Sequence, residues 1–184
     1  DPEFIVLDEP TSALDVSVQS QILNLLKSLQ QTLQLTYLFV THHLLVVKYI
    51  SDRVAVMYGG RIMETGYARD LYADARNPYT SGLLHSIHRT DTALTEWLPE
   101  IPGSPRAITE PLKGCPFVSR CPLTDEGCEH VLPDLAEVGN PGHSSACVHQ
   151  AEIVDADALW PSLDHGLETE PEVPDEPTVA IRSL

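Results

Sequence analysis

The chain has 184 residues, of which 27 are acidic and 11 basic, and its formal net charge is -16. This length suits one domain or slightly more, with enough mass for a hydrophobic core, and the acidic balance argues against a nucleic-acid partner because phosphate contacts need clustered Lys and Arg. No apolar run approaches the roughly 18 residues that span a bilayer, and no secretory signal pattern is visible.

The first predicted element is a strand. Residues 4–7 form a short, continuous apolar run that is followed by Asp8, Glu9 and Pro10. A run without alternation predicts a strand of a parallel sheet that is buried on both faces, and the proline ends it because it cannot donate to the ladder. Because this strand follows Asp1 so closely, we expect the chain to start inside a larger domain.

A helix and a second strand come next. Apolar residues at helical spacing predict a helix over residues 22–33, with Asp15 or Ser17 placed to cap its start. The apolar residues between 35 and 41 predict a second buried strand. Strand, helix and strand together form a βαβ unit, whose crossover should be right-handed.

The following residues predict a hairpin between two helices. A short helix is expected over 44–50, and two strand-like runs, 53–58 and 61–65, flank Gly59-Gly60. A two-residue Gly-Gly loop between such runs is a strong hairpin signal. Asn77-Pro78 then opens another helix, with the asparagine as cap and the proline at the first helical position. The fold class is therefore α/β.

The chemistry of the chain is expected at its strand ends. In open α/β sheets, ligands bind beyond the carboxyl ends of the strands, and Asp8, Glu9 and His42 follow two such ends. A carboxylate there suits a hard cation such as Mg²⁺, and a second one can orient or deprotonate a water molecule. A histidine nearby can bond a phosphate oxygen. These residues predict nucleotide phosphate hydrolysis.

The longer motifs carry a family resemblance. Residues 4–15, Phe-Ile-Val-Leu-Asp-Glu-Pro-Thr-Ser-Ala-Leu-Asp, resemble the Walker B segment and D-loop of ATP-binding cassette (ABC) ATPases, a branch of the P-loop NTPases. Residues 39–44, Phe-Val-Thr-His-His-Leu, resemble the switch-histidine loop of the same family. The family usually has Asp where this chain has His43, which puts one local hydrogen bond in doubt.

The resemblance implies a role for each matching residue. It implies that Asp8 coordinates the magnesium of MgATP, that Glu9 is the catalytic base and that His42 contacts the terminal phosphate. Ser12 and Asp15 match the D-loop, which crosses to the second ATPase subunit of the dimer and thereby contributes to nucleotide binding.

A subgroup resemblance extends further along the chain. Residues 51–58, 60–62 and 77–80 look like the ATPase subunits of oligopeptide and dipeptide importers. This implies transmembrane permease subunits and a solute-binding protein as partners, with the chain peripheral on the cytoplasmic face of the cell membrane. A DNA-repair ABC ATPase with zinc is disfavoured by the acidic charge and by the Asn-Pro-Tyr-Thr segment at 77–80.

Four cysteines fall in one region that is short of hydrophobic periodicity and needs a staple to fold. Two disulfides would suit an exported protein but not a reducing compartment. Four thiolates can hold zinc, although the tight C-x2-4-C pairs of zinc sites are absent, and an iron–sulfur cluster tolerates wider spacing. The cysteines are Cys115, Cys121, Cys128 and Cys147.

The cysteine region also resembles the C-terminal extension of peptide-importer ATPases, which extends the match to about residue 150. This resemblance implies a 4Fe–4S cluster on the four thiolates, with zinc and free thiols as alternatives. His143 and His149 lie near Cys147 in the sequence, and we expect each to be bonded to solvent or backbone rather than to a metal. The extension is expected to be structural or to serve in docking.

We expect three parts in the chain. Residues 1–90 are the C-terminal part of an ABC ATPase domain, 91–150 are linker and cysteine-rich extension, and 151–184 are a disordered acidic tail. The tail holds nine acidic residues and one basic residue, and it cannot bury enough apolar surface to offset its ordering entropy.

The sequence contains no G-x-x-x-x-G-K-[ST] phosphate loop, no glutamine loop and no Leu-Ser-Gly-Gly signature. We therefore expect that this chain alone neither binds ATP tightly nor hydrolyses it. The leading interpretation is a partial ATP-hydrolysing subunit of a peptide importer. The alternative is a truncated, metal-stapled module that binds the permease or the partner ATPase without turnover.

Overall fold

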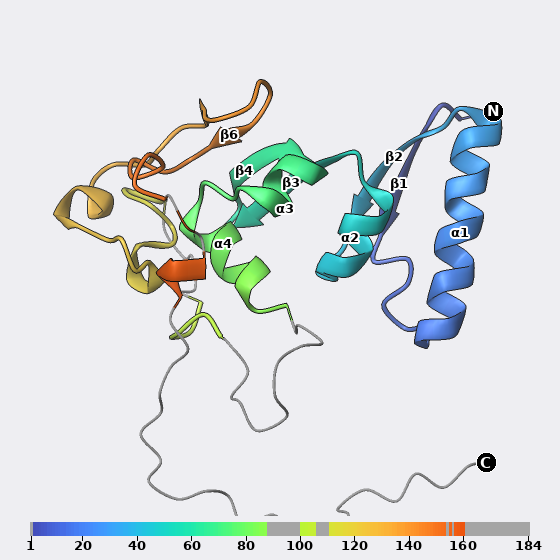
Figure 1. The fold of residues 1–184 in the computed structure, drawn as a ribbon, viewed down its shortest axis with the longest axis horizontal. Helices are drawn as coiled ribbons and strands as arrows, with labels where there is room; N and C mark the ends of the chain where they lie inside the picture. Colours follow the sequence, from blue (N-terminus) through green and yellow to red (C-terminus); the bar gives the residue numbers. More distant parts are fainter. Residues whose placement is uncertain (1, 88–99, 106–110, 154, 156, 161–184) are drawn as a thin grey trace, which may run out of the picture.

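The computed structural model describes residues 2–87, 100–105, 111–153, 155 and 157–160. Figure 1 shows β1, β2, α1 and α2 at one end of the long axis, β3, β4, α3 and α4 in the middle, and the loops with β6 at the other end. The helices and strands are β1 (Phe4–Asp8), α1 (Val16–Leu33), β2 (Thr36–Val40), α2 (Leu44–Ile50), β3 (Arg53–Tyr58), β4 (Arg61–Tyr67), α3 (Ala68–Ala73), α4 (Pro78–His85), β5 (Ala136–Glu137) and β6 (Ser144–Ser145), with 3-10 turns at Val118–Arg120, Glu126–Glu129 and Asp157–Leu159.

The predicted βαβ unit is confirmed. β1 and β2 pair in parallel, in register from Phe4 opposite Thr36 to Asp8 opposite Val40. Helix α1 lies between them in the chain, and its Leu23 is buried with Val46 and Ile50 of α2. The Asp15 carboxylate caps α1 by accepting from the amides of Ser17 and Val18, both at 2.9 Å. Of the two predicted caps, the aspartate is therefore the one used.

The expectation that β1 is buried on both faces is wrong for this structure. Its residues alternate, and Phe4 and Val6 are 55% and 57% exposed. In β2, Leu38 and Val40 are likewise exposed. The reason is that β1 and β2 form a sheet of two strands among the described residues. The small cluster formed with α1 and α2 covers one face of that sheet.

The β3–β4 hairpin forms as predicted, with Gly59 and Gly60 at φ of 58° and 75°. Both values lie in the left-handed region that glycine adopts without steric cost. Val56 lies opposite Glu64 and Met57 opposite Ile62, so Met63 is an extra residue in β4. This bulge explains why Met63 and Glu64, although adjacent, are both buried.

The cysteine-rich extension is joined to the hairpin by sheet pairing. The second sheet has the strand order β3-β4-β6-β5, with β6 antiparallel to β4. The chain therefore returns from the extension to add two short strands to the hairpin. Helix α4 begins as predicted: the Asn77 side chain accepts from the amide of Tyr79 at 3.0 Å, with Pro78 in the first turn.

The second core lies between the hairpin, α4 and the extension. Met63, Phe117 and Trp160 are buried together, and the Trp160 indole N–H donates to the Ser81 hydroxyl at 3.1 Å. Ile153 is also buried. Packed structure thus extends beyond residue 150, where the disordered tail was expected to begin. Apolar residues in an acidic segment can pack when a core lies within reach. Residues 161–184 of the predicted tail lie outside the described residues.

The burial of Trp160 generates a prediction about stability. Trp160→Ala should lower the free energy of unfolding by about 3–5 kcal/mol, because it removes a large buried ring and leaves a cavity. Urea unfolding followed by circular dichroism measures this change. Leu135→Ala, at an exposed site, is the control and should change the midpoint little. An unchanged midpoint for Trp160→Ala would mean that residues 157–160 do not pack on α4.

Candidate functional site

The carboxyl ends of β1 and β2 bring two predicted site residues together. Asp8 ends β1 opposite Val40 of β2, and the amide of Glu9 donates to the Val40 carbonyl at 2.8 Å. Glu9 has φ of 44°, in the left-handed region that non-glycine residues seldom adopt. This turn carries its side chain off the end of the sheet, and outlying backbone of this kind is frequent at functional sites.

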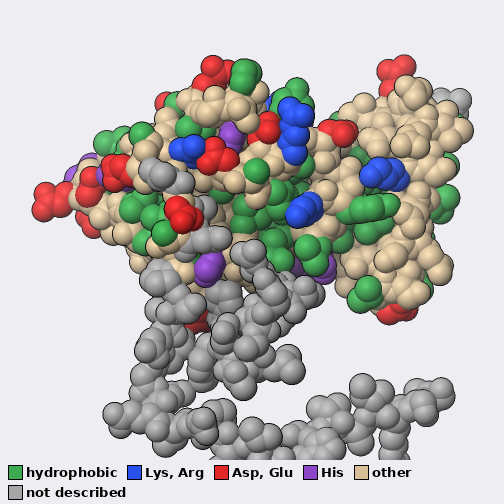
Figure 2. All heavy atoms as spheres, in the orientation of Figure 1, with side chains coloured by type: hydrophobic (Ala, Val, Ile, Leu, Met, Phe, Trp, Pro, Cys, Tyr) green, Lys and Arg blue, Asp and Glu red, His purple; other side chains and the backbone are tan. Residues whose placement is uncertain are grey.

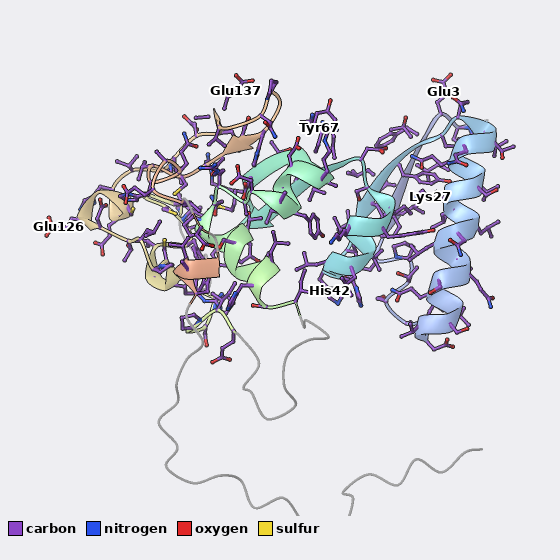
Figure 3. All side chains as sticks on the ribbon, in the orientation of Figure 1. Glu3, Lys27, His42, Tyr67, Glu126 and Glu137 are labelled. Atoms are coloured by element: carbon purple, nitrogen blue, oxygen red, sulfur yellow. The ribbon has the colours of Figure 1, made fainter. Side chains whose placement is uncertain are left out.

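Glu9 and His42 are in direct contact. Glu9 Oε1 lies 2.8 Å from His42 Nδ1, although 33 residues separate them in the chain. Figure 3 shows His42 at the opposite end of the βαβ unit from Glu3, which precedes β1. Both side chains are substantially exposed, at 46% and 75%, so the pair adds little to stability and stays accessible to a ligand. A carboxylate hydrogen-bonded to an imidazole can orient water and exchange protons with it.

Ser12 and Asp15 are engaged in the turn that follows. The Ser12 hydroxyl donates to the Glu9 carbonyl at 3.1 Å, and Asp15 caps α1. Sequence reasoning missed Thr11, which is buried and accepts from the Gln19 side chain at 3.1 Å. These contacts fix residues 9–15 as an ordered connection between the sheet end and the helix. A polar residue at the start of a turn gave no signal that it would be buried.

The four predicted cysteines converge on one cavity. It has a volume of about 20 Å³, room for a single water or ion, and all four cysteines line it together with His149. All four are free cysteines, and Cys128 is buried. Thiols from several loops around one cavity form a donor set for a thiophilic metal.

Backbone contacts hold two of these thiol-bearing loops together. The amide of Cys115 donates to the Cys128 carbonyl at 2.8 Å, and the amide of Cys128 donates to the Asp125 carboxylate at 3.0 Å. Gly114 permits this approach, since a Cβ at that position would overlap the Glu129 carbonyl group.

Burial disfavours the thiolate form of all four cysteines. It raises the pKa of Cys121 to about 12 and that of Cys147 to about 11, and neighbouring thiols add to both shifts. Burial is also the main cause that raises the pKa of Cys115 and the pKa of Cys128. Because a metal ligand must be a thiolate, metal binding here would have to expel these protons.

The two histidines are not bonded to solvent or backbone as expected. His149 Nδ1 lies 2.7 Å from Glu152 Oε1, and its Nε2 lies 3.2 Å from Asp125 Oδ2. The hydrogen bond to Glu152 is the main cause that raises the pKa of His149. His143 is buried and bonds Glu64, at 2.7 Å. Sequence reasoning missed Glu64 because a charged residue in a strand normally points to solvent.

The spacing of the ligand atoms bears on the kind of metal. Across the described parts of the chain, one group of three ligand atoms lies within 4.8 Å of one another, and it consists of Asp125, Cys128 and His149. This mixed set of one oxygen, one sulfur and one nitrogen ligand could hold a single metal ion.

The strand-end site and the cysteine cavity lie in different parts of the molecule. Figure 3 labels His42 beside α2 and Glu126, in the extension, at the far left. Figure 2 shows acidic side chains spread over the left part of this face, where the extension lies. Within the described ranges, no helix has both the length and the apolar character to cross a bilayer.

Comparisons with known proteins find similarity to ATP-binding proteins of peptide transporters. The family described as "Oligopeptide/dipeptide transporter, C-terminal region" matches residues 63–128. A Brucella ovis protein named as a peptide import ATP-binding protein is 48% identical over 148 residues, which cover 80% of this chain and 46% of that protein. The oligopeptide transport ATP-binding protein OppD of Mycobacterium tuberculosis is 44% identical over 154 residues, 84% of this chain and 25% of OppD. The chain spans less than half the length of these relatives.

The tight approach at Gly114 generates a prediction. Gly114→Ala should destabilise the extension by about 1–3 kcal/mol, since the added methyl group would overlap backbone atoms. Lys113→Ala, at the exposed position next to Gly114, is the control and should change stability little. Thermal unfolding and the alkylation rates of Cys115 and Cys128 measure the difference. Equal behaviour of the two variants would contradict the packing described here.

Proposed function

We propose that this chain, which belongs to the ATP-binding proteins of peptide ABC importers, supplies the water-activating part of an ATPase site that drives oligopeptide or dipeptide uptake. The observation that carries the proposal is the contact between Glu9 and His42 at the carboxyl ends of two parallel strands. Ligands of open α/β sheets bind at this edge.

The exposed carboxylates at the strand end fit a hard cation. Asp8 ends β1 with its side chain exposed, and a carboxylate so placed can coordinate the Mg²⁺ of MgATP directly or through water. When bound, this ion would neutralise charge on the phosphates. Glu9 would orient and polarise the attacking water as general base. His42, bonded to Glu9, would contact the terminal phosphate and hold the carboxylate in position.

The same proposal includes the partners of the subunit. Ser12 and Asp15 lie in an ordered, exposed turn next to Glu9, which suits a contact with a second ATP-binding subunit that completes the nucleotide site. Permease subunits in the membrane and a solute-binding protein would complete the importer. The chain would then work at the cytoplasmic face of the membrane. The competing hypothesis is a module that binds these partners without turnover.

Glu9→Gln distinguishes the two hypotheses. In a full-length importer subunit that carries these residues, Glu9→Gln should keep ATP binding and lower turnover by at least about a hundredfold, because an amide cannot accept the proton of water. Phosphate release and nucleotide binding are measured side by side. Glu3→Gln, at the opposite end of β1, is the control and should leave turnover unchanged. Full turnover in Glu9→Gln would remove this residue from the catalytic role.

We also propose that Cys115, Cys121, Cys128 and Cys147 hold a 4Fe–4S cluster. The four soft donors around one cavity, and the wide spacing of the four cysteines along the sequence, support a cluster over zinc. The cavity of about 20 Å³ is smaller than a cluster, which would bind with an outward shift of the thiol-bearing loops. Its place in the extension, away from Glu9, supports a structural or docking role.

Anaerobic purification tests the metal proposal. We expect absorbance at about 400 nm with about four irons per chain, whereas zinc alone would refute the cluster. The raised pKa values of the thiols set the direction of the pH dependence. Because protons compete for the thiolates, metal should be lost progressively as the pH falls, by at least about tenfold in affinity per pH unit. Cys121→Ser should reduce this slope, while an affinity that does not change with pH would contradict thiolate ligation.

A further inference from the structure

A buried carboxylate–histidine pair joins β4 to the segment that leads to Cys147. Glu64 Oε1 lies 2.7 Å from His143 Nε2, and the two side chains are 0% and 1% exposed. The same carboxylate oxygen accepts from the amide of Arg76 at 2.6 Å. Burial raises the pKa of Glu64. Since either partner alone would be a buried polar group without its main contact, the pair holds the two segments together.

A second set of contacts reaches the residue next to Cys147. The Met63 carbonyl accepts from the amide of Ala146 at 2.8 Å, next to the pairing of Glu64 with Ser145. The Asn77 side-chain amide donates to the carbonyls of Met63 at 3.1 Å and of Ala146 at 3.3 Å. Asn77 is itself buried. The backbone on the N-terminal side of Cys147 is therefore bonded to β4 and to the start of α4.

The other side of the cavity is held differently. Cys115 and Cys128 are bonded to each other through their backbones, and Asp125 caps the turn that carries Cys128. These contacts lie within the extension. Cys147 thus approaches the cavity on an arm, residues 143–147, whose position is set by the hairpin and α4. We call Glu64, His143 and Asn77 the β4 latch.

We propose that Glu64 and Asn77 are positioning residues for the cysteine cavity: through the β4 latch they hold Cys147 in place for metal binding. This inference rests on the metal centre proposed above. A metal-binding side chain that is already held in place loses less conformational freedom when the metal binds. Mutation of residues that hydrogen-bond or position such side chains commonly lowers metal affinity by about 10–100-fold. By linkage, bound metal should in turn stabilise β6 against β4.

Two latch variants and one rescue variant test the proposal in the full 184-residue chain. Asn77→Ser keeps a side-chain oxygen for the helix cap but removes the amide donor to Met63 and Ala146. Glu64→Ala removes the acceptor for His143 and Arg76, and Glu64→Gln restores an acceptor of nearly the same shape. Glu137→Gln, an exposed carboxylate on the neighbouring strand β5, is the matched control.

The first readout is the alkylation rate of each cysteine in the reduced, metal-free chain, measured by mass spectrometry. Asn77→Ser and Glu64→Ala should raise the rate at Cys147 by about fivefold, the effect of one lost hydrogen bond on local opening. Cys115 and Cys128 should change by less than about twofold, because their contacts are untouched. Glu64→Gln and Glu137→Gln should stay near the parent rate.

The second readout is metal affinity, measured with iron or zinc against a chelator. Both latch variants should bind about tenfold more weakly than the parent chain, and Glu137→Gln should not. Equal acceleration at all four cysteines, or none, would overturn the latch, because general unfolding does not single out Cys147. If the parent chain takes up no metal, the metal centre fails, and the alkylation pattern still decides whether the latch holds Cys147.

Discussion

The folded arrangement depends on strand β4, because it is paired on both sides. One edge carries β3 of the hairpin, and the other carries β6, which comes from the extension. The bulge at Met63 turns two consecutive side chains inward, so that Met63 enters the apolar core with Phe117 and Trp160 while Glu64 meets His143. A single irregularity in one strand thus joins the β3–β4 hairpin to the cysteine-rich extension.

The Glu9–His42 pair and the cysteine cavity differ in their exposure to solvent. Glu9 and His42 are exposed at the end of a short sheet, where a charged ligand can reach them without desolvation of a buried pair. The thiols sit around a small cavity whose low polarity disfavours the thiolate form. The first pair is open to a ligand from solvent, whereas the thiols are shielded from it.

In the first sheet, the apolar character of the strands and their burial do not coincide. Phe4 and Val6 in β1 and Leu38 and Val40 in β2 share one face that the described residues do not cover. The relatives are more than twice as long as the matched segment. The unbroken apolar runs are a property of the sequences of β1 and β2. Burial of both faces of their sheet would require further elements packed against the exposed face.

The sequence by itself determined the local elements and the residue types at the strand ends. The Gly59-Gly60 turn, the Asn77-Pro78 helix start and a helix cap at Asp15 or Ser17 all follow from short-range rules, because backbone angles and unpaired amides are set by neighbours in the chain. It also predicted site roles for Glu9, His42 and the four cysteines, because their motifs resemble those of a known family, and these roles stay predictions.

Only the tertiary structure decided which of these residues meet. The contact of Glu9 with His42 depends on the parallel pairing of β1 with β2. The burial of Glu64 depends on a bulge that no periodicity announces, and its partner His143 lies 79 residues away. Composition alone assigned Trp160 to a tail, but it packs in a core built by distant segments of the chain. Contacts of this range are set by packing rather than by local propensity, so they appear only once the chain is folded.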